Sequence, residues 1–192
     1  MSSNTLLITV QQIKDRTALH SNVDEKMVKP DIKYAQDAYI LPMLGTALML
    51  KLQADIEADN VTGNYETLLN QYIVDALVYH TLAESPMTLS FQLYNKGAVR
   101  KTGIDTDTPN VNEVIQMSDK YRKRAEWYTQ RLADYLLENH TLFPEYDTPG
   151  TGIDVFIPEV AQYNTPFYLG DDCKCTDGSF DVAPSKYKKG CR

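Results

Sequence analysis

Two tyrosine triplets with heptad spacing constrain the fold of this chain most strongly. A tyrosine recurs every seven residues over two stretches, Tyr65, Tyr72 and Tyr79 and then Tyr121, Tyr128 and Tyr135. Seven residues make nearly two turns of an α-helix, so each triplet lies on one helix face. The spacing therefore predicts two long helices whose tyrosines lie in the core or in a seam between helices. A stacking surface for nucleic acid or ligand is the alternative interpretation.

Capping residues mark the starts of both long helices. The first follows Asn64, and Pro86 is expected to stop it. The second starts at Asn110, which Glu113 follows at the spacing of a capping box. Each helix carries apolar residues three and four positions apart between its tyrosines, as expected of an amphipathic helix.

Three shorter helices are expected before the first triplet. Cap spacing and apolar periodicity define their starts, and Pro42 and Gly45 break or kink the path before the third. The expected positions are a start near Thr9 with a capping box to Gln12, a start near Asn22 with a cap to Glu25, and a helix over Thr46–Ala58.

A hairpin or protruding loop is expected between the two long helices. Residues Thr88–Tyr94 alternate in part as a strand does, and Asn95-Lys96-Gly97 is a turn sequence. Such a segment projects from a bundle, and projecting loops often carry contacts. Its basic residues, Lys96, Arg100 and Lys101, are therefore candidate contacts for a partner.

Residues 141–192 differ in composition from the rest of the chain. They hold 5 of the 9 prolines, 5 of the 9 glycines and all 3 cysteines, which excludes a long helix. Apolar anchors recur among them, so we expect an extended arm that lies on its own core or on a neighbouring subunit, with a mobile tail as the alternative. The anchors expected at a partner interface are Phe143, Tyr146, Phe156, Ile157, Val160, Tyr163, Phe167 and Tyr168.

The predicted fold class is thus mainly α. A small bundle of about five helices, with a protruding loop or hairpin, occupies residues 1–140, and a long extended C-terminal arm follows over 141–192. The longest strongly apolar stretch, around Tyr39–Leu52, is interrupted and falls short of the ~20 residues of a membrane span. The N-terminus lacks the basic and apolar regions of a signal peptide. We therefore expect no membrane partner.

The charge balance argues against a free-standing nucleic-acid binder. The chain has 26 acidic and 19 basic residues and a formal net charge of −7, whereas phosphate contacts need an excess of Lys and Arg. One basic cluster stands out nevertheless, at Lys120, Lys123, Arg124 and Arg131. It is interpreted either as a solvated face balanced by Asp119, Glu126 and Asp134, or as a patch that faces passing DNA or an acidic partner.

Motifs for catalysis or cofactor binding are missing from the sequence. There is no phosphate-binding loop, no nucleophile elbow and no HExxH pair. His80 is interpreted as a packing residue. Cys173, Cys175 and Cys191 supply three thiols with no nearby histidine, whereas a structural zinc site needs four ligands. We expect no catalytic residue, no cofactor and no metal, and the role of the cysteines stays open.

Two segments carry a resemblance to a known family. They read NVDEKMVKPDIKYAQDAYILPMLG at residues 22–45 and LYNKGAVRKTG at residues 93–103. With the order of elements around them, they resemble the head–tail connector (adaptor) proteins of tailed bacteriophages, in the branch found in crAss-like and related phages of Bacteroidetes. The resemblance covers about residues 5–140 and leaves the arm outside it.

The resemblance implies a structural role and no enzymatic activity. Such proteins are helical bundles that form a homo-oligomeric ring, typically of twelve copies, at the head–tail interface of the virion after assembly in the host cytoplasm. The ring lies beneath the portal protein, contacts tail or other ring proteins, and surrounds the channel through which genomic DNA passes without sequence-specific binding. The alternative function is a helical DNA- or ligand-binding module that uses the basic cluster and the tyrosines, and a small helical enzyme is a third.

Overall fold

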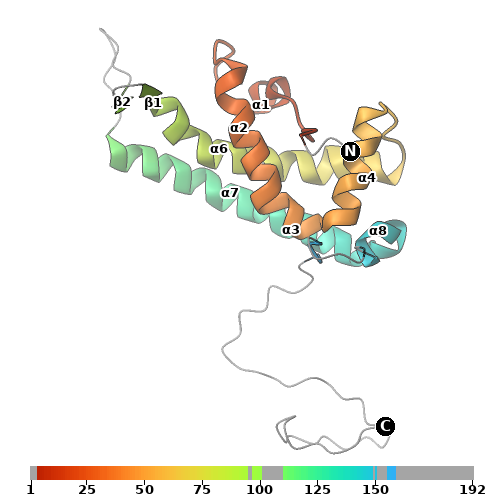
Figure 1. The fold of residues 1–192 in the computed structure, drawn as a ribbon. Coiled ribbons are helices and arrows are strands. Elements are labelled where there is room, and N and C mark those ends of the chain that lie inside the picture. Colours follow the sequence, from red (N-terminus) through yellow and green to blue (C-terminus); the bar gives the residue numbers. More distant parts are fainter. Residues whose placement is uncertain (1–3, 95–96, 101–109, 149, 151–154, 159–192) are drawn as a thin grey trace, which may run out of the picture. The chain divides into compact units, whose positions relative to one another are not determined.

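The structure is a computed structural model that describes residues 4–94, 97–100, 110–148, 150 and 155–158 (Figure 1). These residues are mainly helical, which confirms the predicted fold class. The chain separates into two compact units, residues 1–160 and 161–192, and the second lies outside the described residues. The helices and the hairpin therefore all belong to the first unit.

The N-terminal half contains one bent helical path between two separate helices. The capping box between Thr9 and Gln12 is confirmed. The backbone N–H of each residue donates a hydrogen bond to the side-chain oxygen of the other. The second cap was misplaced by two residues: the N-cap is Asp24, and not Asn22, and its side chain accepts the backbone N–H of Lys26 at 2.9 Å. The elements are α1 Val10–Arg16, α2 Glu25–Ala35, a π-helical turn Gln36–Ile40, α3 Leu41–Leu44 and α4 Thr46–Glu57.

The π-helical turn places a buried glutamine against the N-terminal segment. Gln36 is fully buried, and its side-chain Oε1 accepts the backbone N–H of Leu7 at 2.9 Å. Its Nε2 donates to the backbone oxygen of Thr5 at 3.1 Å, which also accepts from the Nε2 of Gln53. A buried side-chain amide needs hydrogen-bond partners for both its N–H and its oxygen. For Gln36 these partners are the backbone groups of Thr5 and Leu7.

The C-terminal half contains the two long helices that the tyrosine spacing predicted. They run side by side and are joined at one end by the hairpin (Figure 1). The capping box of Asn110 and Glu113 is confirmed. The elements are α5 Asn64–Leu68, a π-helical turn Leu69–Ile73, α6 Val74–Ser90, β1 Phe91–Tyr94, β2 Gly97–Arg100, α7 Val111–Glu138, a 3-10 turn His140–Leu142 and α8 Pro144–Asp147.

The prediction that Pro86 ends its helix was wrong, because α6 continues to Ser90. A proline inside a helix costs about 3 kcal/mol, since it removes one hydrogen bond and crowds the preceding turn. Pro86 is itself buried, and most apolar side chains of α6 are buried where this helix packs against α2 and α7. The free energy gained by this burial offsets the cost of the proline. The strand is correspondingly shorter than expected. It pairs antiparallel from Phe91 opposite Arg100 to Tyr94 opposite Gly97.

One hydrophobic core joins nearly all the helices. It extends from the N-terminal segment through α2, α4, α6 and α7 to the residues around α8. Its largest fully buried side chains are Ile13, Ile32, Ile40, Leu44, Leu48, Leu52, Leu68, Ile73, Leu77, Leu132, Leu136 and Phe143. The helical unit thus continues past residue 140, where we expected the arm to begin.

Candidate interaction surface

Tyrosines of both triplets meet between α7 and the helical path that runs from α5 through the π-helical turn into α6, and Tyr121 is partly buried against the core. Tyr72 stacks on Tyr135 with ring centroids 3.9 Å apart, and Tyr79 stacks on Tyr128 at 5.1 Å. The step of seven residues forward from Tyr72 to Tyr79 corresponds to the step of seven back from Tyr135 to Tyr128, because the two helical paths are antiparallel. Tyr65 continues the series against Phe143 at 5.5 Å, with the rings edge to face. The predicted seam is therefore confirmed, and we call these six rings the aromatic ladder.

Two arginines of α7 cover the outer edge of the aromatic ladder. The guanidinium of Arg131 lies 4.6 Å from the ring centroid of Tyr72, and that of Arg124 lies 5.9 Å from the ring centroid of Tyr79. Arg131 also donates to the backbone oxygen of Gln71 at 3.3 Å. A guanidinium over an aromatic face is attracted by the ring quadrupole, so both charges are held at the surface in defined positions.

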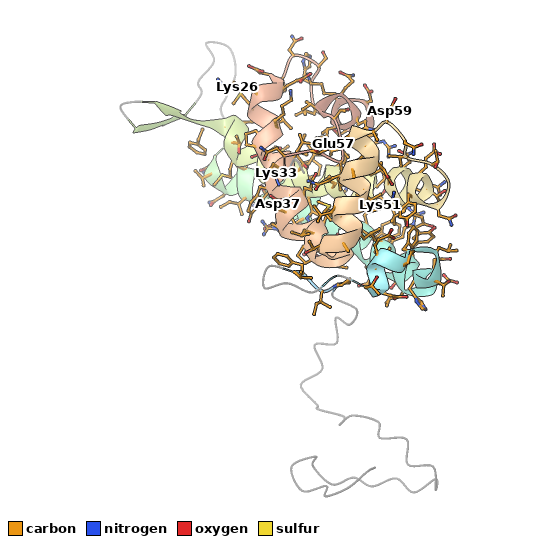
Figure 2. All side chains as sticks on the ribbon, turned by 45° about the vertical axis from the view of Figure 1, so that its right-hand side comes forward. Lys26, Lys33, Asp37, Lys51, Glu57 and Asp59 are labelled. Atoms are coloured by element: carbon orange, nitrogen blue, oxygen red, sulfur yellow. The ribbon has the colours of Figure 1, made fainter. Side chains whose placement is uncertain are left out.

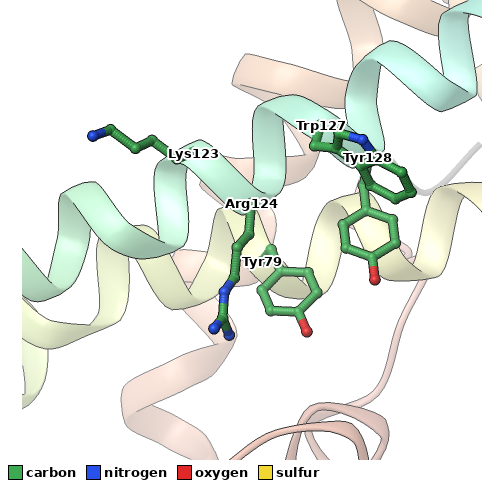
Figure 3. Close-up of a pocket in the computed structure, with 5 residues that line it drawn as sticks. All are labelled: Tyr79, Lys123, Arg124, Trp127 and Tyr128. Atoms are coloured by element: carbon green, nitrogen blue, oxygen red, sulfur yellow. The ribbon is translucent and has the colours of Figure 1, made fainter.

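An exposed tryptophan lies beside these arginines. Trp127, the chain's one tryptophan, is 62% exposed and meets Tyr128 edge to face at 4.8 Å. Figure 3 shows Arg124 running alongside the ring of Tyr79, whereas Lys123 points away from the rings. Together, Tyr79, Lys123, Arg124, Trp127 and Tyr128 line an open hollow of about 400 Å³. A large apolar ring exposed among cations is typical of a contact surface.

The predicted basic cluster lies on this same face. Its four side chains are all exposed, and each is three, four or seven residues away from Trp127, which places them on one side of α7. They are Lys120, Lys123, Arg124 and Arg131. We call these four cations with Trp127 the basic face. Within the part of the chain that the structure describes, none of the four forms an ion pair. Of the neighbouring acids expected to balance this face, Asp119 pairs with Arg122 at 3.8 Å and Asp134 accepts a hydrogen bond from Gln130 at 2.8 Å.

Two of the expected interface anchors are buried in the monomer instead. Phe143 is fully buried against the aromatic ladder, and Tyr146 of α8 is buried in the same core. Burial in their own subunit removes these two rings from any partner surface, which corrects their expected role. α8 causes this placement, since it folds the chain back against α4.

Residues 155–158 of the arm lie against the junction of α3 and α4. The N–H of Phe156 donates to the Oγ1 of Thr46 at 2.8 Å, and the N–H of Thr46 donates to the oxygen of Phe156 at 3.1 Å. Pro158 is buried over Gly45. Phe156 is nevertheless 46% exposed and Ile157 72% exposed, so both keep apolar surface open to a partner.

The other predicted contact residues are not placed by the structure. Arg100 belongs to β2, and its side chain is not described. The remaining ones lie outside the described residues, namely Lys96, Lys101, Val160, Tyr163, Phe167 and Tyr168, as do Cys173, Cys175 and Cys191.

His80 is a packing residue, as expected. Its ring stacks on Tyr39 with centroids 4.1 Å apart, and its Nε2 is 2.8 Å from the Oγ1 of Thr129. Burial lowers the pKa of His80 to about 4, and the positive charge of Arg122 acts in the same direction. Tyr39 in turn donates to Glu84 at 2.8 Å, and burial together with this carboxylate raises the pKa of Tyr39 to about 12. Both groups are therefore uncharged near neutral pH.

Among the described residues, no three His, Cys, Asp or Glu side chains lie close enough together to hold a metal ion. In the same part of the chain, no helix is both long and apolar enough to cross a membrane. The structural feature that sequence reasoning missed is Trp127. Trp127 follows Lys123 by four residues and Arg124 by three and lies off the tyrosine stripe. This spacing alone could have predicted that it shares the exposed face of the basic cluster.

Fold and surface together define a mainly helical protein with a basic and aromatic helix face that stays exposed among the described residues. The comparison with family models assigns its family. Residues 40–154, more than half of the chain, match the model described as "Family of unknown function (DUF6712)", so the chain belongs to this family. No curated protein and no solved structure matches this chain.

Proposed function

We propose that the protein is a structural subunit of a head–tail connector ring, located in the virion beneath the portal protein. It joins the capsid to the tail and surrounds the DNA channel by contact and without catalysis. The specific assignment comes from the resemblance of residues 22–45 and 93–103 to phage adaptor proteins. The structure supports it with a helical unit whose described residues leave the basic face of α7 exposed.

The observation that carries the proposal is the basic face of α7. Trp127 is 62% exposed among four cations that form no ion pair within the described residues. Burying an aromatic ring and pairing a cation with an acceptor both lower the free energy of a protein. The monomer has neither gain at this face, whereas a subunit contact could supply both. A subunit that works only in an assembly explains such a surface, since assembly buries it.

Electron microscopy of the purified full-length protein tests the proposal. We expect closed rings with an axial opening, because connector subunits surround a DNA channel. Single compact particles at every protein concentration would contradict it. Detection of the protein in purified virions, by mass spectrometry of the particles, tests the location separately.

The second candidate function is a DNA- or ligand-binding module. The observation that favours it is the same face, in which stacked rings lie under arginines. It predicts that the isolated monomer binds DNA and that rising salt weakens this binding steeply. Replacing Lys120, Lys123 and Arg124 with glutamine would then abolish binding.

A further inference from the structure

We propose that the basic face of α7 in one copy binds the acidic end of the next copy. The acidic end comprises the C-terminus of α4, α5 and α8, with the carboxylates of Glu57, Asp59, Glu66, Glu145 and Asp147. This inference rests on the proposed function, because it names the contact by which one subunit joins the next.

The acidic end is a continuous part of the bundle. α8 packs against α4, and the hydroxyl of Tyr65 in α5 donates to Glu145 in α8 at 2.7 Å, so the three elements lie together. Figure 2 shows Lys51 and Glu57 on α4 and Asp59 just beyond the end of that helix. Two basic side chains described in this region are already engaged: Lys51 pairs with Asp55 at 2.6 Å, and His140 lies 3.0 Å from Asp147. The carboxylates therefore present a net negative surface.

The two surfaces are complementary and do not meet within one copy. In the described residues, no cation of the basic face pairs with a carboxylate of the acidic end. A patch that meets a different patch on the neighbour makes a heterologous contact, and such contacts close into a ring when the rotation allows it. The aromatic and arginine side chains of the basic face are of the types that dominate the binding energy at protein interfaces.

Nucleic acid fits the basic face less well than a second copy does. Asp134 and Glu138 are exposed seven and eleven residues after Trp127, on the same side of α7, and they would repel phosphates there. The net charge of −7 also disfavours the approach of a polyanion. A second copy carries its carboxylates separately and among apolar groups, at a far lower charge density than a phosphate backbone, so both penalties are smaller for it.

Charge reversal on each side tests the contact. The first variant carries Lys123→Glu and Arg124→Glu, the second carries Glu57→Lys and Glu66→Lys, and a third carries all four changes. We expect the first and second variants to dissociate, with the apparent dissociation constant of the contact raised at least about tenfold, since like charges then face each other. The third variant restores opposite charges and should regain the oligomer.

The control is Lys26→Glu with Lys33→Glu, which makes the same charge change as the first variant but on α2 (Figure 2). It should leave the oligomer intact. Native mass spectrometry gives the oligomeric state, and thermal unfolding confirms that each variant is folded. All substituted side chains are exposed or partly exposed, so folding should be retained.

Three outcomes overturn the inference in distinguishable ways. If the first variant assembles like the wild type, the basic face is not the subunit contact, although the proposed ring stands. If the wild type never assembles, both proposals fail. If the wild type binds duplex DNA in a salt-dependent manner, and the first variant loses this binding but keeps its oligomer, the basic face belongs to nucleic acid.

Discussion

Tyr72 and Tyr135 stack with ring centroids 3.9 Å apart and planes 16° from parallel, although they come from helices on opposite sides of the hairpin. This pair fixes the register of α6 against α7, because moving either helix by one turn would separate both stacked pairs. It also sets Arg131 over the ring of Tyr72. The seam that holds the bundle together therefore also positions the basic face.

A double-mutant cycle measures the stacking of this pair. We expect the loss of unfolding free energy for Tyr72→Ala and Tyr135→Ala together to be smaller than the sum of the single losses, with a coupling of about 0.5–1.5 kcal/mol. Urea denaturation of the four proteins provides the values. Tyr34, which is 55% exposed, serves as control, because Tyr34→Ala should combine additively with Tyr72→Ala. Additive losses for the stacked pair would show that the rings do not interact.

Protonation of His80 should destabilise the fold in acid. The folded-state pKa is about 4, below the ordinary value of 6.5, so the unfolded chain binds the proton more tightly. The stabilisation is fully present above about pH 6.5 and is lost as the pH falls toward 4, up to roughly 3 kcal/mol. Urea denaturation at pH 7, 5 and 4 should show a flatter pH dependence for His80→Gln than for wild type. His20 is exposed, so His20→Gln should retain the wild-type slope, and equal slopes for both variants would refute the role of His80.

Gly45 should tolerate alanine less well than Gly63 does. Both have positive φ, at +76° and +64°, so alanine is strained at either position by about 1–3 kcal/mol. A Cβ on Gly45 would also lie 2.8 Å from the ring of Pro158, whereas nothing lies within 4 Å at Gly63. Urea denaturation should therefore show a larger loss for Gly45→Ala, and Pro158→Ala in the same chain should remove part of the excess. Equal losses at the two glycines would mean that the arm does not lie on Gly45.

Phe143 should behave as a core residue and its neighbour Leu142 as a surface residue. Phe143 is fully buried and Leu142 is 43% exposed. We expect Phe143→Ala to cost about 3–5 kcal/mol of unfolding free energy and Leu142→Ala to cost under about 1 kcal/mol. The comparison by urea denaturation decides whether the helical unit includes α8. Similar small losses of unfolding free energy for both variants would show that Phe143 is not part of the core and belongs to the arm.

Sequence periodicity predicted the long helices and the seam because spacing by seven places residues on one helix face. It did not predict that Tyr72 meets Tyr135, since spacing describes one helix and the register depends on both. The cap at Asp24 was missed because Asn22 has the same chemistry, and only the backbone conformation decides between them. Pro86 was misjudged because packing outweighed its local cost.

The candidate site was predicted in part for the same reason. Lys120, Lys123, Arg124 and Arg131 were found as a cluster, because helical spacing alone brings them together. The seating of Pro158 over Gly45 joins segments far apart in the chain, and no local pattern reports such a contact. Phe143 was assigned to the arm because α8 is a single short turn that composition does not reveal.

The native mass of the purified 192-residue chain tests the central claim most directly. A connector subunit should assemble into one closed species whose mass is a fixed multiple of 21.8 kDa, consistent with a ring of about twelve copies as the resemblance implies. The mass should stay constant over a wide range of protein concentration. A species of 21.8 kDa that persists at the highest concentration would contradict the account.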